Sequence, residues 1–533
     1  MKKITAQSVK PLLTDGAEIA FLDIREHGQY GEGHPFLSVH LPYSKIETYA
    51  PKLIPCKQVR CVLLDNGDGV SERAFSVLEN LGYMNVIVLD GGAPAWEKAS
   101  YNLFKGVNVP SKAFGELVER ELQTKSVTAD ELHKMQVTDE NVIVLDGRSG
   151  EEFNKLSLPK AMSCPNAELG YRLPTLCSDP KTKVVVNCAG RTRSIIGAQT
   201  LVLLETPNPV YALQNGTQGW RLAGYELDHG SEISNLPEPS KEDWESGLSK
   251  ALELQEKYGL QTIENETAQA WLRDPAMTTY LFDVRTREEY DAGHAPRARF
   301  APGGQLVQAT DEQLAVRNAR IILSCDNGLR SATTAIWLIG MGHQVWLLDI
   351  ATPLDDMLDL TSEPVRAKQT IGLDQLREYA NAGTKILDAS PGLSYREGHI
   401  KGSKWVTRAR INFEDLGSPE DWVITGSCRI LIGGIVADVE AATGKTFKGV
   451  VKGTQETWAK AGLEVVATPD EPSEEECIDY LFFVHDRHDG NLEAARRYLE
   501  WELGLLAQMD QQEKSVLNPL LPAATSRRIN VAT

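Results

Sequence analysis

A short motif, Asp-x-Arg after an apolar run, recurs along the chain and sets the scale of its folding units. It appears at Asp23-Ile24-Arg25, Asp146-Gly147-Arg148 and Asp283-Val284-Arg285, and a degraded copy begins at Leu387-Asp388. The intervals between the four copies are about 105 to 137 residues, which is the length of a domain and not of a short solenoid repeat. The sequence therefore predicts four tandem domains of one kind.

The segments around each motif alternate between strand and helix patterns. Amphipathic helices are expected near 128–132 and 373–376, and apolar strands near 142–145 and 184–187. These strands are short and apolar throughout, as expected for strands buried on both faces of a parallel sheet. We therefore expect an α/β fold in which each domain is a parallel sheet flanked by helices, followed by a C-terminal helical tail.

The tail is predicted from one amphipathic stretch after an acidic linker, with Asn491 as the N-cap of its helix. Its expected apolar face consists of Leu492, Ala495, Leu499, Leu503 and Leu506. The predicted segments are 1–102 for repeat one, 120–230 for repeat two, 255–352 for repeat three, 366–468 for repeat four and 469–533 for the linker and helical tail.

The composition of the chain limits which kinds of partner and which cellular compartment are expected. The chain has 55 Lys and Arg against 74 Asp and Glu, a net charge of −19, and no basic stripe, which argues against nucleic acid as a partner. It begins without the apolar stretch of a signal peptide, and it has no apolar run long enough for a membrane span, so we expect a cytoplasmic protein with no membrane partner. The eight cysteines form no CxxC pair and no Cys/His spacing typical of zinc, so no zinc site is expected.

Two of the repeats carry a cysteine at an equivalent position. Cys188 and Cys325 each stand 42 positions after the motif Asp, where repeat one has Asp65. Each cysteine is expected between a strand and a helix, where backbone N–H groups and the helix dipole stabilise an anion. The same field is expected to lower the pKa of the thiol and to hold a persulfide. This placement predicts a sulfur-centred nucleophile in repeats two and three.

Each loop also carries a glycine and an arginine. Gly190 and Gly328 allow the backbone to curl around the sulfur, and Arg193 and Arg330, five positions after the cysteine, offer a fixed positive charge. Four residues separate Cys from Arg, whereas the protein tyrosine phosphatase signature has five, enough to encircle a tetrahedral phosphate. The shorter loop favours sulfur as the attacked atom.

Taken together, these motifs resemble the rhodanese family. The resemblance lies in the Asp-x-Arg turn, the Cys-x-x-Gly-x-Arg-Ser loop at Cys325 with its variant at Cys188, and a Gly-rich turn that leads to Trp96 or Trp220. It covers about residues 1–468 and implies a four-repeat thiosulfate sulfurtransferase. It also implies a ping-pong reaction without cofactor, in which the thiolate takes sulfur from thiosulfate as a persulfide and passes it to cyanide or a thiol.

The predicted site residues combine the loops with this resemblance. The catalytic residues are Cys188 and Cys325. The expected substrate-binding residues are Gly190, Arg191, Arg193, Ser194, Gly328, Arg330 and Ser331. The supporting residues, expected to brace the loops as buried ion pairs, are Asp146, Arg148, Asp283 and Arg285.

The repeats are not expected to be equally active. The loop of repeat two offers two arginines and no acid, whereas repeat three places Asp326 beside the thiol. Two like charges about 4 Å apart repel by on the order of 1–4 kcal/mol, so dianionic thiosulfate is expected to prefer Cys188. Repeat one, with Asp65, is expected to be inactive. In repeat four Cys428 is not followed by Gly-x-Arg, so this repeat is expected to be degenerate, and the activity of Cys428 stays open.

Two other functions stay open. One is a non-catalytic sulfur carrier or scaffold, and the other is a Cys-dependent phosphatase or arsenate reductase. The expected partners are a small-molecule sulfur donor such as thiosulfate and a thiol or cyanide acceptor, and a homodimer is left open.

Overall fold

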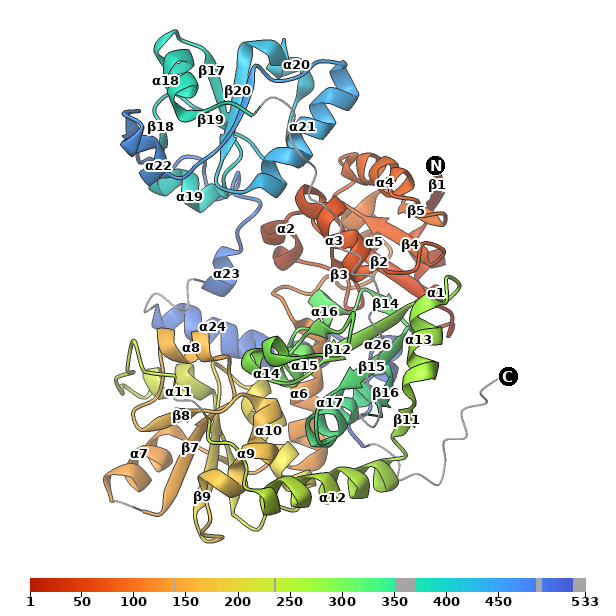
Figure 1. Ribbon diagram of the computed structural model, residues 1–533, viewed down its shortest axis with the longest axis vertical. Coiled ribbons are helices and arrows are strands. Elements are labelled where there is room, and N and C mark those ends of the chain that lie inside the picture. Colours follow the sequence, from red (N-terminus) through yellow and green to blue (C-terminus); the bar gives the residue numbers. More distant parts are fainter. Residues whose placement is uncertain (139, 234–235, 350–369, 486–490, 521–533) are drawn as a thin grey trace. The chain divides into compact units, whose positions relative to one another are not determined.

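The computed structural model describes residues 1–138, 140–233, 236–349, 370–485 and 491–520 (Figure 1). Each repeat holds a sheet of parallel strands with helices packed around it, which confirms the predicted α/β class (Figure 1). The predicted end of repeat three at 352 and the start of repeat four at 366 lie outside the described residues, as do parts of the predicted tail.

The chain divides into two compact units that do not follow the order of the repeats. One unit combines repeats one and four, and the other combines repeats two and three with the C-terminal tail. Both predicted nucleophiles, Cys188 and Cys325, therefore belong to the same unit.

In repeat two the strands lie in the order β6-β10-β9-β7-β8, and all neighbouring pairs are parallel. Their bounds are Ser126–Val127 for β6, Val142–Asp146 for β7, Ala161–Ser163 for β8, Lys183–Asn187 for β9 and Val210–Leu213 for β10. The helices are α6 (Val109–Leu122), α7 (Ala129–Val137), α8 (Gly150–Lys155), α9 (Leu169–Leu176), α10 (Thr192–Leu203) and α11 (Gly216–Leu222). Trp220 of α11 is buried in the core of this repeat against Leu132 and Val185, and a large apolar side chain buried in this way stabilises the fold by roughly 1.5–3 kcal/mol.

Repeat three has the same strand order, β11-β16-β15-β12-β13, again with parallel pairs. The strands are β11 (Gln261–Ile263), β12 (Thr279–Asp283), β13 (Arg299–Phe300), β15 (Arg320–Ser324) and β16 (Gln344–Leu348). The helices are α12 (Lys241–Tyr258), α13 (Asn265–Arg273), α14 (Arg287–Ala292), α15 (Gly303–Gln308), α16 (Thr310–Gln313) and α17 (Leu329–Gly340).

Repeats one and four belong to the other unit, and each has a parallel sheet of the same kind. Repeat one orders its strands β1-β5-β4-β2, with β3 beside β2, and repeat four orders them β19-β17-β20-β21. The strands are β1 (Lys2–Ile4), β2 (Ile19–Asp23), β3 (Val39–His40), β4 (Arg60–Leu64), β5 (Val86–Leu89), β17 (Lys385–Asp388), β19 (Lys404–Trp405), β20 (Trp422–Gly426) and β21 (Gly449–Lys452). The helices include α2 (His27–Glu32), α3 (Ile46–Leu53), α4 (Val70–Asn80), α5 (Gly92–Lys98), α18 (Leu373–Asn381), α19 (Gly392–Glu397), α21 (Arg429–Thr443) and α22 (Gln455–Lys460).

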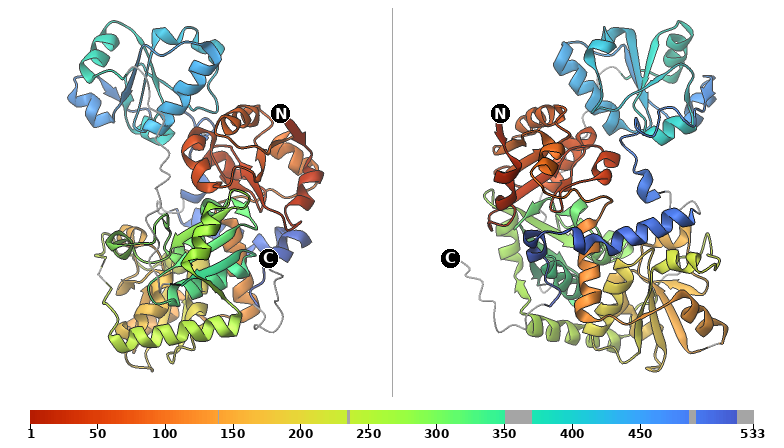
Figure 2. Two further views of the ribbon diagram at one scale, coloured as in Figure 1. Left: turned by 45° about the vertical axis from the view of Figure 1, so that its right-hand side comes forward. Right: turned by 180° about the vertical axis from the view of Figure 1, so that it is seen from behind.

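The C-terminal tail forms α24 (Leu492–Leu503), α25 (Leu505–Gln508) and α26 (Gln511–Val516). Asn491 is the N-cap of α24, as predicted, because its side chain accepts a hydrogen bond from the N–H of Ala494 at 3.0 Å. Helix α24 lies across repeat two (Figure 2).

The predicted apolar face of α24 was wrong in part. Leu492 is 40% exposed and Leu503 is 54% exposed, whereas Glu502 is 1% exposed. The buried side of the helix consists of Ala494, Ala495, Tyr498, Leu499 and Glu502. The helix is rotated so that a carboxylate and an aromatic ring, rather than two leucines, face repeat two.

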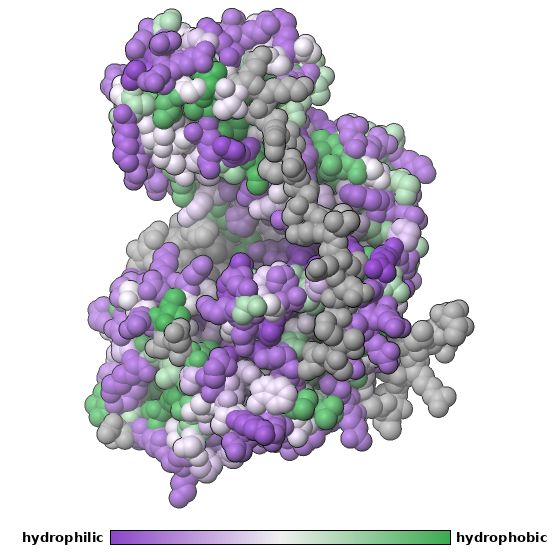
Figure 3. Space-filling view, in the orientation of Figure 1, coloured by the Kyte–Doolittle hydropathy of each residue, from purple (hydrophilic) through white to green (hydrophobic). Residues whose placement is uncertain are grey.

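The visible surface is mostly hydrophilic, with small hydrophobic patches (Figure 3). Among the described helices none has the length and apolar content needed to cross a membrane.

Candidate active site

The register of the parallel strands places the motif residues at one edge of each sheet. Asp146 at the end of β7 pairs with Asn187 at the end of β9, and Cys188 follows directly. The register of β12 and β15 brings Asp283 and Cys325 together in the same way. Because the carboxyl ends of parallel strands meet at a common edge, a motif and a cysteine that are distant in sequence share one site.

The Asp-x-Arg motif forms a buried ion pair beneath each loop. Asp146 accepts hydrogen bonds from Arg148 Nε and Nη2, both at 2.8 Å, and Nη2 also donates to the carbonyl of Leu156 at 2.7 Å. Asp283 accepts from Arg285 Nε at 3.0 Å and from Nη2 at 2.7 Å. The guanidinium groups are thus held within their own motifs, where they brace the loops.

Cys188 lies at the start of the loop in repeat two and is only 2% exposed. Its Sγ donates to Ser194 Oγ at 3.6 Å. Burial raises the pKa of the Cys188 thiol, and the charge of Arg193 and hydrogen bonds from Ser194 act in the opposite direction without overcoming it. The predicted lowering of this pKa was therefore wrong, because desolvation outweighs the local field.

The two arginines of this loop point to different partners. Arg193 pairs with Glu152 of α8, with Nη1–Oε2 at 2.6 Å and Nη2–Oε1 at 2.8 Å, and its charge acts on Cys188. Arg191 instead donates to Glu116 of α6 at 2.6 and 2.9 Å and also contacts Glu119. Arg193 therefore acts on the thiol, whereas the side chain of Arg191 binds α6 and in this way connects the loop to that helix.

A glycine explains the close approach of α11 to this loop. Gly216 has φ +54°, and a Cβ there would lie 2.2 Å from the carbonyl oxygen of Cys188 and 2.8 Å from that of Gly190. The next N–H, from Thr217, donates to the Cys188 carbonyl at 2.8 Å. The Gly-rich turn is therefore required to close the back of the loop, since any side chain would clash with the backbone.

Repeat three builds the same loop around Cys325, which is 3% exposed. The N–H of Gly328 donates to Cys325 Sγ at 3.2 Å, and Sγ donates to Ser331 Oγ at 3.3 Å. Gly328 has φ +80°, a left-handed conformation that side chains rarely adopt. Burial raises the pKa of the Cys325 thiol, Arg330 and Ser331 lower it, and Asp326 adds to the increase.

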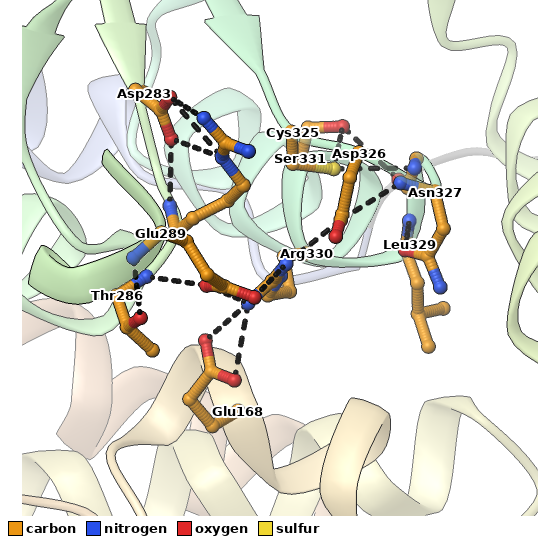
Figure 4. Close-up of polar contacts among 12 residues, drawn as sticks. Glu168, Asp283, Thr286, Glu289, Cys325, Asp326, Asn327, Leu329, Arg330 and Ser331 are labelled. Carbon is orange, nitrogen blue, oxygen red and sulfur yellow. Dashed lines mark hydrogen bonds and ion pairs between the residues drawn. The ribbon is translucent and has the colours of Figure 1, made fainter. Parts of the chain in front are cut away.

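Arg330 is surrounded by carboxylates (Figure 4). Nη1 contacts both oxygens of Glu168 at 3.0 and 3.2 Å and Glu289 at 2.7 Å, and Nη2 contacts Glu289 at 3.0 Å and Asp326 at 2.7 Å. The side chain is fully buried. Three carboxylates thus share one guanidinium, whereas Arg193 contacts one carboxylate among the described residues.

In repeat one the equivalent loop holds a carboxylate in place of a thiol. Asp65 Oδ1 accepts the N–H of Gly67 at 2.8 Å, and Oδ2 accepts the N–H of Ser71 at 2.9 Å. Asp65 is 2% exposed. The side chain therefore fills the loop with its own anion, and no thiol stands there.

Repeat four departs furthest from this plan. Cys428 is the N-cap residue of α21, so the helix starts immediately after it and no Gly-x-Arg loop intervenes. The Cys428 side chain is partly exposed.

Several acidic residues at the two sites were not predicted. Glu152 and Glu289 each lie six positions after the motif Asp and complete capping boxes with Ser149 and Thr286. That shared Ser/Thr-x-x-Glu pattern is a signal that identifies them in sequence. No comparable local pattern identifies Glu502, which reaches the Cys188 loop from α24.

The fold and the site together define a class of protein: tandem parallel α/β domains in which a cysteine begins a loop between a strand and a helix at the carboxyl edge of a sheet. A sequence profile of the rhodanese-like domain matches residues 5–99, 128–223 and 264–350. The chain therefore belongs to the rhodanese family, and the resemblance inferred from its motifs is confirmed.

One solved structure aligns with nearly the whole chain. A crystal structure of a thiosulfate sulfurtransferase from Pseudomonas aeruginosa shares 36% sequence identity, and the alignment covers 97% of this chain and 99% of that one with a TM-score of 0.88. A curated HTH-type transcriptional regulator from Mycobacterium tuberculosis is 29% identical over 110 residues, or 21% of this chain. The chain spans about half of the length of that relative, 47%.

Proposed function

We propose that this chain is a sulfurtransferase that takes the outer sulfur of thiosulfate, or of a similar donor, onto Cys188 as a persulfide. The acceptor is cyanide or a thiol. Cys325 is a second, weaker centre, and the reaction uses no metal or organic cofactor. The 36% identity to a thiosulfate sulfurtransferase over 97% of the chain supports this choice of donor.

The observation that carries the proposal is the carboxylate of Asp65. Two backbone N–H groups bind it at 2.8 and 2.9 Å, so a loop of this form accommodates an anion at the tip of its sheet. Repeats two and three place a thiol at the equivalent position. Backbone N–H groups placed in this way, together with Arg193, offset part of the cost that burial imposes on the thiolate and the persulfide anion, which carry their charge on sulfur.

The chemistry has two steps. In the first, the Cys188 thiolate attacks the outer sulfur of thiosulfate, a bond forms between the two sulfurs, and sulfite leaves with the electrons of the broken S–S bond. In the second, the acceptor attacks the outer sulfur and Cys188 leaves as the thiolate. Arg193 supplies positive charge to the anion in both steps, and Gly190 and Ser194 shape the loop.

Mass spectrometry of the intact protein and its peptides tests the proposal. Treatment with thiosulfate is expected to add roughly 32 Da, one sulfur, to the peptide that holds Cys188. The peptide with the fully buried Cys164 serves as the internal control, and Cys188→Ser is expected to abolish the gain. No gain on either loop cysteine would contradict the proposal. Labelling without turnover on adding cyanide would favour a sulfur carrier, and hydrolysis of a phosphate ester that depends on Cys188 would favour a phosphatase.

A further inference from the structure

Helix α24 of the C-terminal tail brings a carboxylate to the loop of Cys188. Glu502 is 1% exposed, and its Oε1 accepts a hydrogen bond from Thr192 Oγ1 at 2.9 Å. Thr192 is the first residue of α10, four positions after the cysteine. One oxygen of Glu502 is therefore fixed to the helix that follows the nucleophile.

The second oxygen of Glu502 faces the loop without a hydrogen-bond donor. A Cβ built on Gly190 would lie 3.2 Å from Glu502 Oε2 and 3.8 Å from Tyr498 Cε1. Oε2 is buried, and no group in the described part of the chain donates to it. A buried acceptor left unsatisfied costs about 1–3 kcal/mol, so native structures rarely keep one without a role.

A second polar group at the same loop is also unsatisfied. Gln218 of α11 is 7% exposed, and its backbone N–H donates to the carbonyl of Ala189 at 3.2 Å. Neither the oxygen nor the nitrogen of its side-chain amide has a hydrogen-bond partner among the residues that the structure describes. Glu502 of α24 and Gln218 of α11 thus both contact the Cys188 loop, Gln218 through its backbone N–H, and each also has a buried side-chain atom with no partner among the described residues, as expected where a small polar ligand binds.

The cationic group nearest to Glu502 in the loop is bound to other carboxylates, so Glu502 can still bind a small polar ligand. The charged groups that face it are Arg191 of the loop and Glu116 of α6, and Arg191 is already engaged by Glu116 and Glu119. Lys112 of α6 lies over the rings of Tyr498 and Trp501, 5.6 and 5.2 Å from their centroids. The free oxygen is therefore suited to a hydrogen-bond donor and unfavourable to an anion.

We propose that Glu502 accepts the proton of a neutral thiol that takes sulfur from the Cys188 persulfide. This inference rests on the proposed function and specifies its acceptor: a small thiol enters protonated and is activated at the site. In this step the S–H bond of the acceptor breaks and its proton goes to Glu502 Oε2. The acceptor sulfur bonds to the outer sulfur of the persulfide, the S–S bond breaks, and Cys188 leaves as the thiolate. The acceptor departs as its own persulfide, and no oxidant or reductant is consumed.

A single-turnover experiment with two acceptors tests this role. The full-length protein is first loaded with thiosulfate and then mixed with either glutathione or sulfite, and the loss of sulfur from Cys188 is followed by mass spectrometry. Glutathione must lose a proton before it attacks, whereas sulfite attacks through a lone pair on a sulfur that carries no proton. In Glu502→Gln, which keeps the shape of the side chain and an oxygen for Thr192, transfer to glutathione is expected to slow by about 10²-fold, a typical contribution of a general base. Transfer to sulfite is expected to be unchanged or faster, because a negative charge has been removed.

The matched control is Glu500→Gln, since Glu500 is an exposed carboxylate on the same helix. Its transfer rates to both acceptors are expected to equal those of the wild type. Equal rates to glutathione in Glu502→Gln and the wild type would overturn the inference while the proposed function stands. An equal loss of both transfers, with a lower melting temperature, would show that Glu502 only anchors α24 and would also overturn it. If the wild-type protein takes no sulfur from thiosulfate, both the proposed function and this inference are overturned.

Discussion

Arg330 and Glu168 come from different repeats, yet the guanidinium Nη1 contacts both carboxylate oxygens, at 3.0 and 3.2 Å. Both side chains are buried. Glu168 also binds Arg172 at 3.0 Å, so repeat two contributes to the electrostatics of the site in repeat three. The positive charge of Arg330, which is expected to attract substrate at Cys325, is consequently already balanced by carboxylates of the same chain.

This difference predicts unequal contributions of the two cysteines. Cys188→Ser is expected to remove most of the thiosulfate-dependent kcat/KM, and Cys325→Ser a smaller part. Among the described residues Arg193 has one carboxylate partner, with Glu502 as a further acid near Cys188, whereas Arg330 itself is bound by three carboxylates. If the extra acids near Cys325 weaken the binding of dianionic thiosulfate by about 1–3 kcal/mol, the kcat/KM values of the two centres for thiosulfate differ by roughly 5- to 150-fold. Steady-state rates with thiosulfate and cyanide measure this, and equal losses or the reverse order would contradict it.

A second prediction concerns the acid beside Cys325. Asp326 raises the pKa of the Cys325 thiol and also occupies Arg330. Asp326→Asn is therefore expected to lower that pKa and to raise the thiolate fraction of Cys325 near neutral pH by about tenfold for each unit of pKa. The rate of alkylation of Cys325 is expected to rise by a smaller factor, because a thiolate becomes less nucleophilic as its pKa falls. The pH dependence of alkylation by iodoacetamide, read on the Cys325 peptide, measures the effect. Asp291→Asn, at an exposed position of the same repeat, should leave the profile unchanged, and an unaltered profile in Asp326→Asn would refute the prediction.

Much of the fold could be predicted because its signals are local. The strands expected near 142–145 and 184–187 correspond to β7 and β9, and each differs from the expected range by one residue at one end. Continuous apolar runs between turn residues determine where these strands begin and end. The loops could be located for the same reason: the cysteine directly follows a strand. The ion pair of Asp146 and Arg148 likewise lies within three residues of sequence.

The electrostatics of the sites could not be predicted in the same way. Arg191 was expected to face substrate, but Glu116, 75 positions earlier, holds it at α6. The opposing partners of Arg330 and the approach of Glu502 also depend on contacts between distant segments. Burial of the Cys188 thiol is a consequence of that packing, and so the direction of its pKa shift required the structure.

The ion pair of Glu289 with Arg330 makes a third prediction, on pH and stability. Burial opposes ionisation of Glu289, but the hydrogen bonds and charge of Arg330 outweigh it and lower the pKa of this carboxyl from 4.5 to about 2. A carboxyl whose pKa is depressed in the folded state stabilises the protein above its unfolded pKa and loses this contribution as pH falls. Glu289→Gln is therefore expected to lower the free energy of unfolding by on the order of 1–3 kcal/mol at neutral pH, after allowance for partial exposure.

Urea unfolding of the wild type and Glu289→Gln between pH 2 and pH 7 measures this difference. It should be constant above pH 4.5 and should shrink as pH falls toward 2, the window set by the two pKa values. A difference that persists unchanged at pH 2 would show that the glutamate acts through packing and not through its charge.

A fourth prediction concerns Arg408, which joins repeats one and four within their unit. Its side chain is 1% exposed, contacts Glu47 at 2.6 and 2.7 Å, and contacts Asp438 at 2.7 and 3.0 Å. Arg408→Leu would leave two carboxylates without their cation, and removal of one partner from a buried ionic cluster costs about 3–5 kcal/mol. The free energy of unfolding of this unit is expected to fall by that amount, as measured by chemical denaturation. Arg410→Leu, at an exposed position two residues away, should change it little. Because Cys188 belongs to the other unit, sulfur transfer in Arg408→Leu is expected to persist under conditions where the protein is folded, and its loss there would contradict the assignment of the chemistry to repeat two.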